Sequence, residues 1–261
     1  MVVQHNLSAI NTNRQMGVVT NALQKSTEKL SSGYKINRAA DDAAGLSISE
    51  KMRSQIRGLN KASDNAQDGI SLIQVAEGAL NETHSILQRM NELATQAAND
   101  TNTSVDRQSI KDEIKQLNEE LDRISTTTQF NKQDLLTGGF SGKLQVGALE
   151  GQTMDVKISL AVSAKGLKVS AVEVSTNAKA GAAMQSIQDA IESVSKQRSK
   201  LGAIQNRLEH TINNLDTNAE NTQAAESRIR DTDMADEMVQ YSKNNILSQA
   251  GQSMLAQANQ Q

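Results

Sequence analysis

The side chains that could carry chemistry are few, and their spacing does not favour catalysis or metal binding. His5, His84 and His210 are scattered over 261 residues, with no cysteine to complete a zinc site beside them. Asp41 and Asp42 could form a carboxylate pair for acid–base work, but adjacent residues on a capped turn point apart and no general base is nearby. The sequence also lacks a Walker-type phosphate loop and a GxSxG nucleophile elbow. We therefore predict that the protein is not an enzyme and has no catalytic residues, cofactor or metal ion.

The composition favours long helices with narrow hydrophobic faces. The chain has no proline, so the strongest helix breaker is absent. Aromatic residues make up 2% and hydrophobic residues 37% of the chain, against roughly 45–50% in ordinary globular domains. The net charge of −3, without clusters of Lys and Arg, predicts no nucleic-acid partner.

No stretch of the sequence has the character of a membrane span or a cleavable leader. No window approaches the ~20 apolar residues that a spanning helix requires. The N-terminus, MVVQHNLSAINTNRQ, has neither an apolar core region nor an early basic cluster. We expect no membrane insertion, and either a cytosolic location or export by a route that reads no such signal.

Hydrophobic periodicity predicts five helices arranged almost symmetrically about a small β region. The first covers about 3–32, and a long helix with a seven-residue apolar repeat covers about 43–98. A shorter helix over 104–125 has the clearest amphipathic pattern. Helix returns over about 178–230, where Arg198 occupies a seam position, and a last helix follows the break RDTDMAD.

Two kinds of signal interrupt the helices. Gly33 fits a left-handed helix stop, and Asp41 or Asp42 fits the N-cap of the next helix. The alternating runs KLQVGA and MDVKISLAV, joined by LEGQT, predict a β-hairpin. The segment GLKVSAVEVS is a candidate for one further short strand.

The first and last helices have apolar faces too sparse to be stable alone. Isolated helices of this kind are marginal in water, so the simplest arrangement pairs the two ends with each other and with neighbouring copies. A heterologous contact between copies that does not close produces an open helical filament. The residues predicted to form this core coiled coil are Leu7, Ile10, Met238, Tyr241, Ile246 and Leu247.

The most specific signal in the sequence is a set of six long motifs. The N-terminal half contains LSSGYKINRAADDAAGLSISEKMRSQIRGL, NAQDGISLIQVAEGALNETHSILQRMNEL and SIKDEIKQLNEELDRI. The C-terminal half contains KLGAIQNRLEHTINNL, AAESRIRDTDMADEM and NNILSQAGQSMLAQANQQ. These motifs occur in the same order in the bacterial flagellins, which the sequence resembles over nearly all of 1–128 and 185–261.

The resemblance implies a mainly α fold of the flagellin D0/D1 type, an elongated antiparallel coiled-coil bundle with a small β-hairpin region. The outer domains D2 and D3 of many members are expected to be absent, and members usually continue past the position of Gln261 with a short apolar tail. The implied divisions are D0 at 1–33 and 237–261, a spoke linker at 34–43 and 230–236, and a D1 rod at 44–229 with the β region at about 129–176.

The resemblance also implies function, partners and location. Members polymerise into the helical flagellar filament used for motility, after secretion through the flagellar type III apparatus to the cell exterior. Implied partners besides further copies of the chain are the flagellin export chaperone, the filament cap and the hook-junction proteins. The alternative is a hook–filament junction protein of the same secretion system, which would assemble in few copies.

Two sets of residues are singled out on this basis. Flagellins are ligands of Toll-like receptor 5, and the corresponding stretch here places Gln88, Arg89 and Leu93 on one helix and Glu113 on its neighbour. The two breaks in the helical pattern are expected to lie together as the spoke. Its candidate subunit–subunit contacts are Asn37, Arg38, Asp41, Asp42, Arg230 and Asp231.

Overall fold

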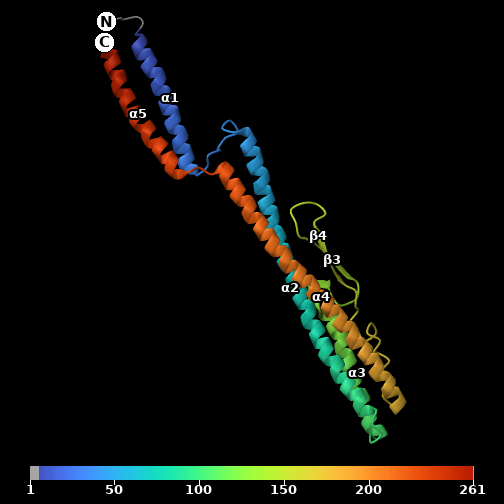
Figure 1. The fold of residues 1–261 in the computed structure, drawn as a ribbon. Helices are drawn as coiled ribbons and strands as arrows, with labels where there is room; N and C mark the ends of the chain where they lie inside the picture. Colours follow the sequence, from blue (N-terminus) through green and yellow to red (C-terminus); the bar gives the residue numbers. More distant parts are fainter. Residues whose placement is uncertain (1–5, 261) are drawn as a thin grey trace. The chain divides into compact units, whose positions relative to one another are not determined.

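A computed structural model describes residues 6–260, and within this range the protein consists of five helices and two small antiparallel strand pairs (Figure 1). The predicted mainly α class is confirmed. His5 and the first residues of the first predicted helix lie outside the described range. The helices are α1 (Leu7–Ser32), α2 (Ala43–Ala97), α3 (Ser104–Thr127), α4 (Asn177–Arg230) and α5 (Met234–Gln260), and the strands are β1 (Gln129–Phe130), β2 (Gln133–Asp134), β3 (Phe140–Gln145) and β4 (Thr153–Ile158).

The chain divides into two compact units. The first contains the chain up to Ile56 and from Ala219 onward, and the second contains Arg57–Asn218. Helices α2 and α4 contribute to both units. Within the described residues, no helix combines the length and apolar character needed to cross a membrane.

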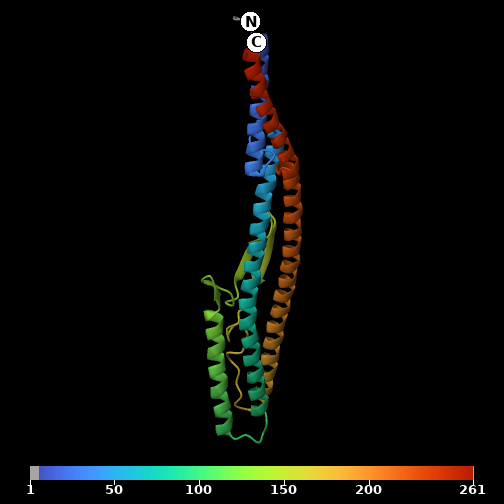
Figure 2. The same ribbon diagram turned by 90° about the vertical axis from the view of Figure 1, so that its left-hand side faces the viewer.

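In the first unit, α1 and α5 run antiparallel and pack side by side (Figure 2). Near one end of the pair, the side-chain amide of Asn6 donates a hydrogen bond of 2.7 Å to the carbonyl of Ala258. Near the other end, Lys29 forms an ion pair of 3.5 Å with Glu237. Helix α5 begins at Met234, inside the stretch predicted as a break, because the Asp233 carboxylate accepts the amides of Ala235 and Asp236 and caps it.

The second unit is built on the seven-residue repeat. Ile73, Leu80 and Leu87 of α2 are fully buried in the same core as Ile187 and Leu201 of α4, as the heptad pattern requires. One face of α3 completes this core with Ile110, Ile114, Leu121 and Ile124. The polar seam residue of α4 is Gln197 rather than the predicted Arg198. Gln197 is 4% exposed, and its amide donates to the carbonyl of Lys157 at 3.4 Å.

The predicted hairpin is confirmed as β3 and β4, paired from Phe140↔Ile158 to Gln145↔Thr153. Alternate residues of β4, Met154, Val156 and Ile158, face the core, which is the period-two pattern of a half-buried strand. The further strand predicted in GLKVSAVEVS is wrong, because this segment folds as turns and irregular backbone. The pair of β1 and β2 was not predicted, and it is only two residues long on each side.

Small residues allow the hairpin to lie directly on α2. A Cβ atom at Gly58 would lie 2.8 Å from the Cβ of Ala148 at the hairpin tip, and one at Gly69 would lie 2.2 Å from a methyl group of Leu144. The side-chain amide of Asn65 also donates to the carbonyl of Gln145 at 3.1 Å. These contacts therefore hold the hairpin at a fixed position along the axis of α2.

Candidate assembly and recognition surfaces

The two breaks in the helical pattern lie against each other in the first unit. Gly33 ends α1 with φ = +75°, and the chain then forms an isolated antiparallel bridge between Tyr34 and Asp231. The amide of Lys35 donates to the carbonyl of Arg230 at 2.6 Å, and the amide of Thr232 donates to the carbonyl of Gly33 at 3.0 Å. Main-chain hydrogen bonds thus join the segment between α1 and α2 to the segment between α4 and α5.

Arg230 is a largely buried charged side chain of this junction. Its guanidinium lies 4.8 Å from the centroid of the Tyr34 ring, within cation–π range. The same group donates to Glu50 on α2 at 2.7 Å, and the Arg230 side chain is only 13% exposed. Both partners belong to the first unit, so Arg230 ties the beginning of α2 to the end of α4.

Asp41 and Asp42 have separate structural tasks. The Asp42 carboxylate accepts the amide of Gly45 at 2.9 Å, so Asp42 caps α2, one of the two residues predicted for that role. The Asp41 carboxylate accepts the amides of Arg38 at 3.0 Å and Asn37 at 3.4 Å. These hydrogen bonds, above all that from Arg38, hold the pKa of Asp41 below its ordinary value, and Lys25 at 3.7 Å acts in the same direction.

The remaining polar residues of the junction are partly committed within the chain. The side-chain amide of Asn37 donates to the carbonyl of Tyr34 at 2.9 Å. The Arg38 guanidinium pairs with Glu28 at 2.9 Å, yet its side chain remains 72% exposed. All six predicted spoke residues therefore lie in one hydrogen-bonded region, and the charge of Arg38 is accessible to another molecule.

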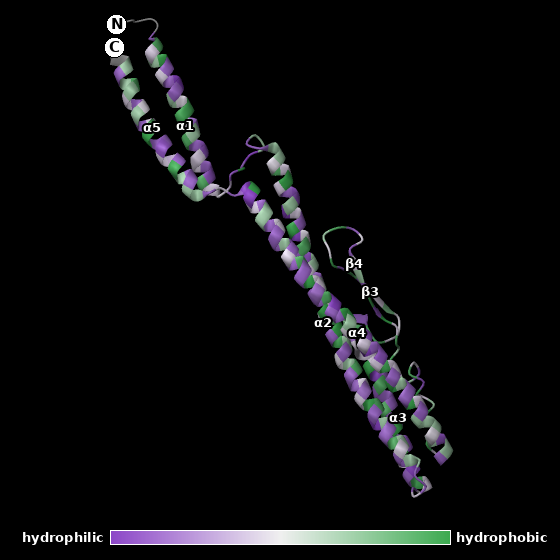
Figure 3. Cartoon of the chain, in the orientation of Figure 1, coloured by the Kyte–Doolittle hydropathy of each residue, from purple (hydrophilic) through white to green (hydrophobic). Residues whose placement is uncertain are grey.

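Helices α1 and α5 leave most of their large apolar side chains in water. Figure 3 shows hydrophobic and hydrophilic residues interspersed along both helices. Leu7 is 75% exposed and Ile246 is 66% exposed, while Tyr241 is half-buried. The exposed set of the two helices comprises Leu7, Ile10, Val18, Met234, Met238, Val239, Ile246, Leu247 and Met254. Exposed apolar surface of this extent typically marks a protein–protein interface.

The residues singled out for receptor recognition lie on neighbouring faces of α2 and α3. Arg89 pairs with Glu113 across the two helices at 2.9 Å and with Glu92 on its own helix at 3.1 Å. The Glu113 hydrogen bond is the main cause that raises the pKa of Arg89. Gln88 is exposed beside His84, whereas Leu93 is only 2% exposed and packs in the core beneath.

No constellation of reactive groups accompanies these surfaces. Within residues 6–260, no cluster of three or more His, Asp or Glu side chains is arranged to hold a metal ion. The second unit is a packed coiled-coil rod, and the first exposes apolar helical faces beside a hydrogen-bonded junction. Such a fold defines a helical structural subunit that associates through its surfaces.

Comparisons with known proteins agree with this class. Residues 3–141 match the bacterial flagellin N-terminal helical region, and residues 184–261 match the bacterial flagellin C-terminal helical region. A flagellin of Halalkalibacterium halodurans is 56% identical over 263 residues, which cover 100% of this chain and 97% of the relative. The flagellar filament 31.3 kDa core protein of Treponema maltophilum is 50% identical over 275 residues, which cover 99% of this chain and 96% of the relative. The crystal structure of Bacillus cereus flagellin matches with a TM-score of 0.53 and 34% identity over 62% of this chain and 94% of that chain.

The chain therefore belongs to the bacterial flagellin family. This family consists of structural subunits that polymerise into the flagellar filament, not of enzymes. The predicted structural role, self-association and location in the flagellum are confirmed at this level.

Proposed function

We propose that this chain builds a filament used for motility, with the exposed faces of α1 and α5 forming the contacts between copies. The observation that carries the proposal is the apolar surface that the α1–α5 pair leaves in water. Complete burial of a side chain such as Leu7 or Ile246 stabilises by about 1.5–3 kcal/mol. Several such side chains on each copy supply the driving force for association, offset by the entropy lost on binding.

Seeded polymerisation tests this proposal directly. Purified monomer is mixed with filament fragments, and helical filaments are scored by electron microscopy and pelleting. Ile246→Asp should abolish growth because it would bury a charge at the interface. Val105→Asp is the matched control, since Val105 is 72% exposed on α3 of the other unit. Equal growth of wild type and Ile246→Asp would refute the role of α5.

The spoke residues are proposed to add polar contacts between copies. Arg38 carries this part of the proposal because its charge is exposed despite the Glu28 pair. An exposed ion pair contributes at most about 1 kcal/mol to folding, so Arg38→Ala should leave the melting temperature of the monomer nearly unchanged. It should nevertheless raise the critical concentration for polymerisation, whereas Lys61→Ala, which removes the exposed Lys61–Asp64 pair, should not. If Arg38→Ala lowered the stability of the monomer and its assembly together, Arg38 would act in folding rather than in contacts between copies.

Export to the cell exterior by the flagellar type III apparatus is part of the same proposal. The export chaperone, the filament cap and the hook-junction proteins are the proposed partners. Copy number distinguishes this proposal from the alternative of a hook–filament junction protein. A filament subunit should dominate the protein sheared from the cell surface, while a junction protein should be a trace band.

Recognition by Toll-like receptor 5 is proposed as a second role of the chain, at the neighbouring faces of α2 and α3. The exposed Arg89, held by Glu113 and Glu92, supports it, because arginine is a frequent anchor of interfaces. Gln88 and Glu113 would contact the receptor beside it, and buried Leu93 would support the helix from beneath. Arg89→Ala should reduce signalling in receptor reporter cells, and Arg123→Ala is the control because Arg123 forms a similar exposed pair with Glu120. Equal signalling by both variants would contradict this role.

A further inference from the structure

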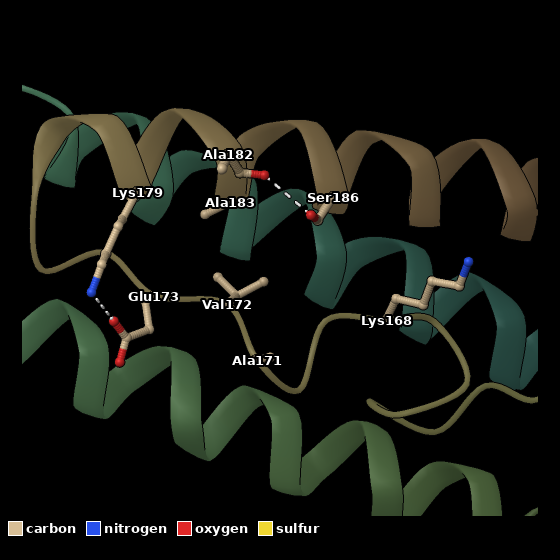
Figure 4. A pocket seen from close by; sticks show the side chains of 8 residues that line it. All are labelled: Lys168, Ala171, Val172, Glu173, Lys179, Ala182, Ala183 and Ser186. Atoms are coloured by element: carbon tan, nitrogen blue, oxygen red, sulfur yellow. Dashed lines mark hydrogen bonds and ion pairs between the residues drawn. The ribbon is translucent and has the colours of Figure 1, made fainter.

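A shallow groove opens in the second unit between α4 and the segment that precedes it. Its volume is about 360 Å³, which is within the range of pockets that hold small ligands or side chains. Figure 4 shows Val172 pointing from the irregular segment toward Ala182 and Ala183 of α4, with Lys179 and Lys168 near opposite ends. The floor of the groove is therefore apolar and its ends carry cationic groups.

The charge of this groove is positive. Its one carboxylate, Glu173, pairs with Lys179 at 2.6 Å and with Lys111 at 3.3 Å, and these two ammonium groups lower the pKa of Glu173. Lys168 is exposed and forms no ion pair within residues 6–260. The groove therefore fits an apolar group followed by a negative charge.

The tip of the β3–β4 hairpin presents that combination. The side chain of Leu149 is 67% exposed, and the next residue, Glu150, is exposed and has no ion-pair partner within the described residues. The main chain of Leu149 is fixed, because its amide donates to the Gln152 side chain at 3.1 Å and its carbonyl accepts the Gln145 side chain at 2.7 Å. A rigid turn thus holds a leucine and a carboxylate outward.

These two features cannot meet within one chain. The hairpin tip contacts α2 at Gly58, whereas the groove lies level with Thr95, whose hydroxyl donates to the sulfur of Met184 at 3.3 Å. Thr95 follows Gly58 by 37 residues of continuous α2 helix, so the two levels are separated by about 55 Å. Any contact between the hairpin tip and the groove must join two copies.

We propose that the hairpin tip of one copy docks into the groove of the next, with Leu149 against Val172, Ala182 and Ala183 and Glu150 beside Lys168. This proposal rests on polymerisation as proposed above and adds a contact that is independent of α1 and α5. Tip and groove are different surfaces, so each copy uses its tip on one neighbour and its groove on another. A contact of this kind propagates without closing and produces an open assembly. Copies that share it are displaced by about 55 Å along α2.

Charge reversal in a mixture tests whether the contact runs between copies. Glu150→Lys alone and Lys168→Glu alone should each raise the critical concentration for seeded growth severalfold, because like charges then face each other. An equal mixture of the two variants should grow nearly as well as wild type. In an alternating arrangement, each tip of one variant meets a groove of opposite charge on the other variant. Leu149→Ala should raise the critical concentration about tenfold, the factor for loss of an interface anchor.

Cysteine cross-linking provides a second readout, since the native chain has no cysteine. Leu149→Cys monomers mixed with Ala182→Cys monomers should form a disulfide-linked dimer during growth under mild oxidation. Ser195→Cys is the control, because it is also exposed on α4 but lies 13 residues further along the helix, about 20 Å away. Circular dichroism checks that every variant monomer keeps its helices.

The outcomes separate this contact from polymerisation itself. If wild-type monomer forms no filaments, the proposed function fails and the contact fails with it. If wild type grows but the charge mixture grows no better than its components, or cross-linking with Ala182→Cys does not exceed that with Ser195→Cys, the contact alone is overturned.

Discussion

Helix α2 contains four glycines, and three of them, Gly58, Gly69 and Gly78, permit a graded test of how closely the hairpin packs on this helix. Alanine is favoured over glycine in a helix interior by about 1 kcal/mol. Gly78 is exposed with no atom within 4 Å of an added Cβ, so Gly78→Ala should be stabilising by that amount. For a domain of this size the melting temperature should rise by about 2–4 °C.

Gly58→Ala should not stabilise the protein, although it gains the same free energy from helix propensity. The new Cβ would lie 2.8 Å from the Cβ and 3.3 Å from the Cα of Ala148, against about 3.5–4.0 Å for favourable carbon contacts. The hairpin tip would have to move, and overpacking of this kind costs about 1–3 kcal/mol. The net change is therefore between about zero and 2 kcal/mol of destabilisation. Gly69→Ala should be intermediate, because the atom in its way is the flexible end of Leu144.

Thermal unfolding of the monomer by circular dichroism at 222 nm measures the three changes. Hydrogen exchange of the β3 and β4 amides gives a local readout, and it should accelerate in Gly58→Ala but not in Gly78→Ala. If Gly58→Ala were as stabilising as Gly78→Ala and left hairpin exchange unchanged, the close seating of the hairpin on α2 would be refuted.

Three further predictions concern the core, a helix cap and one carboxylate. Leu87 is fully buried, so Leu87→Ala should cost about 2–5 kcal/mol in denaturant unfolding; a loss below 1 kcal/mol would contradict its place in the seam. Thr103 forms a capping box with Asp106 at the start of α3, so Thr103→Ala should cost about 1 kcal/mol, measured in the same way. Because the folded-state pKa of Asp41 is lowered, its contribution to stability is present above the ordinary carboxyl pKa near 4 and is lost as the pH falls through the lower folded value. Asp41→Ala should therefore lower the melting temperature at pH 7 more than at pH 2.5, and an equal drop at both values would argue against that linkage.

The helices could be predicted from the sequence because their signals are local and repeated. Ile73, Leu80 and Leu87 mark one face of α2 at every seventh residue, and this repeat alone determines which side is buried. The error at Arg198 has a physical cause. Gln197 and Arg198 are adjacent, and the choice between them depends on the partner carbonyl of Lys157, which belongs to a distant strand.

The strands and caps were harder to predict because they depend on tertiary contacts or on short signals. The segment before α4 alternates like a strand, but it has no neighbouring strand to pair with and folds as turns. At the start of α3, Thr103 is the N-cap and Asp106 its partner, although Ser104 and Asp106 could also serve as N-cap residues. Two acceptors within one turn are difficult to rank without backbone angles.

The first unit has a small hydrophobic core. Within its described residues the only large apolar side chain that is buried is Ile36, and α1 itself buries only Ser26. Two paired helices can cover only one face of each other, so a second apolar stripe on either helix has no partner in the chain. The conformational entropy lost on ordering a residue is about 1–2 kcal/mol, and a unit with so small a core offsets little of it. The proposed contacts of α1 and α5 with other copies would supply further stabilising free energy, so the stability of this unit is expected to rise when the filament forms.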